Sequence, residues 1–128
     1  MLKSILCGAA LLAAFAAPGA LAAEPASAVP PSAKGGMFVT AKGMTLYTFD
    51  KDTAGKSMCN GQCATNWPPA IVGDGAKPAG DWTFITRDDG MKQWAYKGKP
   101  VYAWIKDTKP GDTTGDGFLN GAWHIAKP

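Results

Sequence analysis

The chain has 128 residues, with 13 Lys or Arg against 10 Asp or Glu and a formal net charge of +3. This length allows one small domain, and its scattered lysines, with a single arginine and no basic run, exclude a nucleic-acid interface. The 16 Gly and 10 Pro favour turns and short strands over helices.

The N-terminus has the features of a secretory signal peptide. Lys3 precedes an apolar run over residues 5–17, which is shorter than a membrane span, and an Ala-Leu-Ala segment ending at Ala22 suits a signal peptidase. We therefore predict a signal peptide over residues 1–22, a periplasmic or secreted product, and no membrane span. Residues 23–34, rich in Ala, Pro and Ser, are predicted to form a flexible lead-in.

The rest of the chain, residues 35–128, is predicted to form a single all-β domain. Runs of β-branched and aromatic residues alternate with Gly-containing turns, which is the strongest local signal for hairpins. We expect a small antiparallel sheet or sandwich. Its predicted strands cover residues 38–40, 45–49, 82–86, 93–96 and 101–105, with a last hairpin over 118–125 that turns at Asn120-Gly121.

One sequence pattern occurs twice, as KGMTLYTFDKD beginning at Lys42 and as KGKPVYAWIKD beginning 55 residues later at Lys97. Each copy has a Tyr, a second aromatic residue two positions later and an Asp after the strand. Residues i and i+2 of a strand share a face, so the two aromatic side chains of each copy stand side by side. Each Asp follows its strand, where it can accept backbone N–H bonds from the next turn. We predict two related hairpin repeats, about 36–69 and 82–128, whose aromatics share a core rather than forming a ligand platform. The repeated positions are Tyr47, Phe49 and Asp52, then Tyr102, Trp104 and Asp107.

Two cysteines remain after the predicted signal peptide, Cys59 and Cys63. A close pair in an oxidising compartment predicts a disulfide, which would pin an otherwise irregular loop. Metal binding is the alternative, because Met58, Cys59, Cys63 and His124 supply soft ligands for copper(I) or zinc. These four residues do not follow a recognisable ligand spacing.

The two Y-x-[FWY]-x-x-D motifs stand on either side of Cys59-Asn60-Gly61-Gln62-Cys63 and are followed by a Gly- and Thr-rich stretch at 110–117. This combination resembles a bacterial family of secreted repeats, described as predicted lipoproteins with this Tyr/Asp motif. The resemblance covers about residues 35–128 and implies a secreted, β-rich repeat of unknown function. It brings no catalytic or binding residues. Many relatives carry a lipid-attachment Cys after the signal, and this chain has none there.

No constellation of catalytic residues is evident, since Ser57 is the only serine beyond the lead-in and no nucleophile motif surrounds it. We therefore expect a non-catalytic periplasmic or envelope accessory module. It would act as a monomer without a cofactor and bind an envelope partner or a small ligand. The alternative is a periplasmic metal-binding (copper or zinc) or redox-associated protein that uses Cys59, Cys63 and His124.

Overall fold

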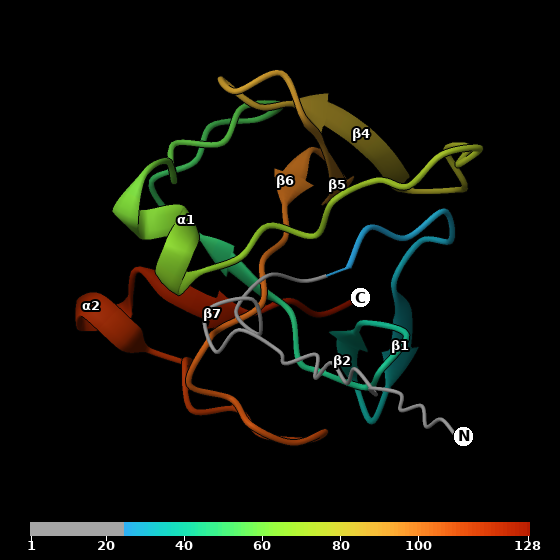
Figure 1. The fold of residues 1–128 in the computed structure, drawn as a ribbon. Helices are drawn as coiled ribbons and strands as arrows, with labels where there is room; N and C mark the ends of the chain where they lie inside the picture. Colours follow the sequence, from blue (N-terminus) through green and yellow to red (C-terminus); the bar gives the residue numbers. More distant parts are fainter. Residues whose placement is uncertain (1–24) are drawn as a thin grey trace, which may run out of the picture.

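The structure is a computed structural model that describes residues 25–128, so the predicted signal peptide lies outside the described residues. The regular secondary structure of this part of the chain consists of three small antiparallel sheets and two short helices, joined by turns and loops (Figure 1). None of its helices is long and apolar enough to cross a membrane. The sheets pair β1 (Ser32–Lys34) with β2 (Met37–Val39), β3 (Tyr47–Phe49) with β7 (Trp123–Ile125), and β5 (Lys92–Tyr96) with both β4 (Trp82–Thr86) and β6 (Lys99–Pro100). The helices are α1 (Gln62–Asn66) and α2 (Phe118–Gly121).

The three-stranded sheet is built from local hairpins, as the turn residues predict. β4 and β5 pair from Trp82↔Tyr96 to Thr86↔Lys92 around a turn that contains Gly90. β5 turns into β6 at Lys97 and Gly98, whose φ angles of 50° and 84° are those of a tight hairpin turn. The antiparallel all-β prediction is confirmed.

The two repeats interleave rather than standing as separate units. β3 belongs to the first repeat and pairs with β7 at the end of the second, in the register Thr48↔His124. The Ala126 carbonyl accepts the Phe38 N–H at 2.9 Å, and the Ala126 N–H donates to the Leu46 carbonyl at 2.8 Å. Each repeat therefore completes the sheets of the other.

Two hydrophobic clusters fill the interior. The first lies beneath the β4–β5–β6 sheet and the β2 segment, and the second surrounds β3, β7 and the disulfide loop. The first contains Phe38, Leu46, Ala70, Trp82, Trp94, Val101 and Ala126. The second contains Tyr47, Cys59, Trp67, Tyr102, Trp104 and Trp123.

Two predicted strand segments differ from the structure. Residues 101–105 form no regular strand. Their only bridges to described residues are two isolated ones that Tyr102 makes, to Tyr47 and to Pro69. The expected hairpin over 118–125 is wrong: residues 118–121 form α2, and β7 pairs with β3 instead. The chain reverses at Leu119 and Asn120, with φ angles of 58° and 56°, and not at the predicted Asn120-Gly121 turn alone.

The described part of the predicted lead-in, residues 25–34, makes hydrogen bonds to the domain. Ser32–Lys34 forms β1, and the Ser27 N–H donates to the Ile71 carbonyl at 2.9 Å. The Ser27 carbonyl accepts from the Gly73 N–H and from Trp94 Nε1. A Cβ at Gly73 would stand 3.0 Å from the backbone of this segment, so the close approach requires glycine. Backbone hydrogen bonds, which the Ala/Pro/Ser composition does not reveal, fix the lead-in to the domain.

Candidate functional site

The twin tyrosines lie at the junction of the two repeats, where they pair with each other. The Tyr47 N–H donates to the Tyr102 carbonyl at 2.7 Å, and the Tyr102 N–H donates back to the Tyr47 carbonyl at 2.9 Å. Both side chains are fully buried. The two copies of the motif thus meet through a reciprocal pair of backbone hydrogen bonds.

Each tyrosine hydroxyl binds the aspartate of the other repeat. Tyr47 Oη donates to Asp107 Oδ2 at 2.7 Å, and Tyr102 Oη donates to Asp52 Oδ2 at 2.6 Å. We call these two contacts the crossed Tyr–Asp bonds. Burial, followed by the hydrogen bond to aspartate, raises the pKa of both Tyr47 and Tyr102 well above the ordinary value. Both hydroxyls therefore stay protonated and able to donate.

The second oxygen of each carboxylate holds the loop that follows its own strand. Asp52 Oδ1 accepts the Met58 N–H at 2.7 Å. Asp107 Oδ1 accepts the Thr114 N–H at 2.9 Å and the Thr114 hydroxyl at 2.6 Å. Burial raises the pKa of Asp52 more than its bonds from Tyr102 and Met58 lower it. Each aspartate thereby joins its own loop to the opposite repeat.

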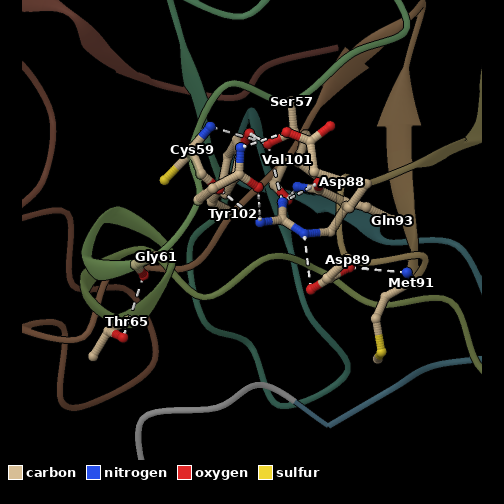
Figure 2. A network of polar contacts seen from close by, with 12 residues as sticks. Ser57, Cys59, Gly61, Thr65, Asp88, Asp89, Met91, Gln93, Val101 and Tyr102 are labelled. Carbon is tan, nitrogen blue, oxygen red and sulfur yellow. Dashed lines mark hydrogen bonds and ion pairs between the residues drawn. The ribbon is translucent and has the colours of Figure 1, made fainter.

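The crossed bond between Tyr102 and Asp52 is extended by Arg87 into a buried polar network (Figure 2). Its Nη1 donates to Gln93 Oε1 at 2.7 Å and to Ser57 Oγ at 3.0 Å, and its Nη2 donates to the Cys59 carbonyl at 2.6 Å. Arg87 is 4% exposed, so these bonds give partners to both terminal nitrogens of a guanidinium that is almost completely removed from water. Its Nε is buried without a hydrogen-bond partner and lies 3.9 Å from Asp89 Oδ2.

Ser57 has no free lone pair in this network. Its Oγ lies 2.6 Å from Tyr102 Oη and accepts from Arg87 and from the Cys59 N–H. Because the Tyr102 proton is committed to Asp52, the Ser57 hydroxyl is the donor to Tyr102. Each group in this chain of hydrogen bonds therefore donates to the next, from Arg87 to Ser57, from Ser57 to Tyr102 and from Tyr102 to Asp52. Ser57 thus joins Arg87 to Tyr102 within the network.

Two of the motif aromatics, Phe49 and Trp104, belong to a continuous stack of rings inside the second cluster. Trp67 stacks on Trp123 with ring centroids 3.7 Å apart and on Trp104 at 4.0 Å, and Trp123 stacks on Phe49 at 4.2 Å. A Cβ at Gly115 would stand 2.7 Å from the Trp67 ring, so only glycine fits beside this stack. Trp104 is 7% exposed, which makes it a core residue rather than an open platform.

Cys59 and Cys63 form a disulfide with a Cα–Cα distance of 5.2 Å, and Cys63 lies in α1. Their sulfurs therefore present no thiolate to a metal in this state. Met58 is half exposed, and His124 Nε2 lies 2.8 Å from Asp50 Oδ2 on the outer face of the β3–β7 sheet. Among residues 25–128, no group of three or more His, Cys, Asp or Glu side chains is arranged for a metal ion. Of the four candidate metal ligands, the two cysteines are bonded to each other, His124 is bonded to Asp50, and Met58 is half exposed.

No sequence pattern marks Arg87, Gln93 or Ser57 as partners of the motif. One signal was present: Arg87 is the only arginine of the chain, among 13 Lys plus Arg. A planar guanidinium with several donors suits a buried network in a way that an ammonium does not.

An apolar hollow of about 360 Å³ lies where the ordered lead-in crosses the first cluster. We call it the lead-in groove. Leu46, Ala70, Ile71 and Trp94 line it from the domain side, and Pro25, Val29, Pro30 and Pro31 line it from the lead-in. Thr40 and Lys42 contribute polar groups to the lining. Lys42 forms no ion pair within 4 Å with any described residue.

These features define a small all-β module with a disulfide-pinned loop and two interlocked repeats. The chain belongs to the family described as a secreted repeat of unknown function, whose profile matches residues 31–71 and 83–127. Each match contains one Tyr/Asp motif, and the resemblance drawn from the sequence is confirmed. No curated protein and no solved structure matches the chain.

Proposed function

We propose that this protein is a non-catalytic accessory module of the periplasm or envelope, and that it holds a small amphiphile in the lead-in groove. The groove is the observation that carries the proposal. Its volume of about 360 Å³ falls in the range of small-molecule sites, and its lining is mostly apolar with few polar groups. The crossed Tyr–Asp bonds and Ser57 are engaged internally, which supports a binding rather than a catalytic role.

The lining favours an apolar tail with an anionic head. Val29, Pro30 and Ile71 offer apolar contacts, while Lys42 is the cationic side chain of the lining and has no acidic partner among the described residues. The groove wall is anchored through Ser27 to Ile71 and Trp94 rather than loosely attached. An anchored wall lowers the ordering cost that a flexible segment would add to binding.

Calorimetric titration with dodecanoate, below its micelle concentration, tests this proposal. The wild-type protein should bind dodecanoate more tightly than dodecyltrimethylammonium, and Lys42→Glu should reverse that preference. Val29→Asp should weaken dodecanoate binding about tenfold, because it places a carboxylate in the apolar lining. Val29 is 67% exposed, so this change does not disturb the core.

Met91→Asp is the matched control, since Met91 is also an exposed apolar residue and lies outside the groove. It should leave dodecanoate binding unchanged. Absence of binding to both amphiphiles, or equal losses in Val29→Asp and Met91→Asp, would overturn the proposal.

A further inference from the structure

A second hollow, of about 380 Å³, lies on the outer face of the β3–β7 sheet and shares no lining residue with the lead-in groove. We call it the lysine hollow. Strand alternation explains its floor: Tyr47 and Trp123 point into the core, so their neighbours Thr48 and His124 face outward together. Both of these side chains line the hollow.

Three lysines from two different segments surround this floor. Lys97 and Lys99 come from the β5–β6 hairpin, and Lys127 follows β7. The left-handed turn at Lys97, with φ 50°, positions its ammonium 5.5 Å above the Tyr96 ring. The tertiary fold, and not a basic run in the sequence, brings these cations together.

The charges of the hollow are unbalanced. None of its three lysines forms an ion pair within 4 Å with a described residue. The one acidic side chain of the lining, Asp50, is already paired with His124 at 2.8 Å. The three ammonium groups, which have no acidic partner among the described residues, outnumber the single carboxylate of Asp50, so the hollow carries an excess of positive charge that is complementary to a compact dianion.

We propose that the lysine hollow binds a phosphate monoester group. Lysine binds phosphate as a point charge, and the Thr48 hydroxyl can donate a hydrogen bond from the floor. A soluble phosphate ester and the headgroup of an anionic lipid present the same group, so both sources fit the hollow. Asp50 opposes the anion and limits its affinity.

Titration of the wild-type mature protein with glycerol 3-phosphate, followed by NMR, tests the site. We expect the amide signals of Thr48, Lys97 and His124 to shift. Each of Lys97→Gln, Lys99→Gln and Lys127→Gln should weaken binding about fivefold. Asp50→Asn should tighten it, because it removes the opposing carboxylate.

Lys34→Gln is the matched control, since Lys34 is an exposed lysine on β1 outside the hollow. A parallel flotation assay with phosphatidylcholine vesicles containing phosphatidic acid identifies the source. Binding to glycerol 3-phosphate assigns a soluble ester, whereas binding to the vesicles alone, lost in the triple lysine variant, assigns a headgroup. No binding to either probe, or equal losses in Lys34→Gln and the hollow variants, would overturn the proposal. Neither outcome bears on the amphiphile proposed for the lead-in groove, because the two sites have different lining residues and are tested with different probes.

Discussion

At the scale of single residues, the choice of arginine at position 87 is explained by geometry. Its guanidinium reaches Gln93, Ser57 and the Cys59 carbonyl at once, from three directions. A lysine keeps the charge but cannot present the planar set of donors that this arrangement uses. The buried carbonyl and amide oxygens would then lose their partners.

We therefore predict that Arg87→Lys lowers the free energy of unfolding by about 2 to 3 kcal/mol. Urea denaturation followed by circular dichroism measures this loss. Lys92→Arg, at the exposed first residue of β5, should change stability by less than about 0.5 kcal/mol. An unchanged unfolding midpoint in Arg87→Lys would show that the network does not depend on the guanidinium.

The repeated motif could be recognised in the sequence, but the side chains to which its aspartates bond could not. It predicted that Asp52 and Asp107 accept backbone N–H bonds from the turns that follow, and such bonds are present from Met58 and Thr114. The tyrosine partners lie 50 and 60 positions away along the chain, where no local rule applies. Pairing across that separation follows only from the way the repeats fold together.

At the scale of elements, the hairpins were predictable because their signals are local. Gly90 and Gly98 mark turns between neighbouring strands of one sheet. The hairpin predicted at Asn120-Gly121 failed because β7 has a better partner in β3, where Trp123 stacks with Phe49. Long-range burial of aromatic rings outweighed a local turn preference.

The disulfide closes the loop that directly follows Ser57 and Met58, and the Cys59 carbonyl at the start of this loop belongs to the buried network. Replacing both cysteines with serine should lower the free energy of unfolding by about 2 kcal/mol, the amount expected for so short a loop. Thermal unfolding with and without reductant measures it: reductant should lower the wild-type midpoint and leave the double variant unchanged. A wild-type midpoint that is insensitive to complete reduction, verified by peptide mapping, would contradict this role.

At the scale of the whole molecule, the repeats form one interlocked unit. β3 pairs with β7, the tyrosines pair with each other, and each aspartate reaches the opposite repeat. The duplication visible in the sequence therefore does not produce two independent hairpin domains. It supplies one Tyr–Asp hydrogen bond in each direction between the repeats, so the tyrosine and aspartate of each motif find their partners only in the other repeat.

The central claim is that the Tyr/Asp motif acts between repeats and not within one. Double-mutant cycles on unfolding free energy test it, with Tyr102→Phe combined first with Asp52→Ala and then with Asp107→Ala, and the same series on Tyr47→Phe. The crossed pairs, Tyr102 with Asp52 and Tyr47 with Asp107, should show coupling energies of about 1.5 to 3 kcal/mol, as for hydrogen bonds to charged groups. The pairs within one motif should be additive within about 0.5 kcal/mol. Stronger coupling within a motif than across the repeats would contradict the account.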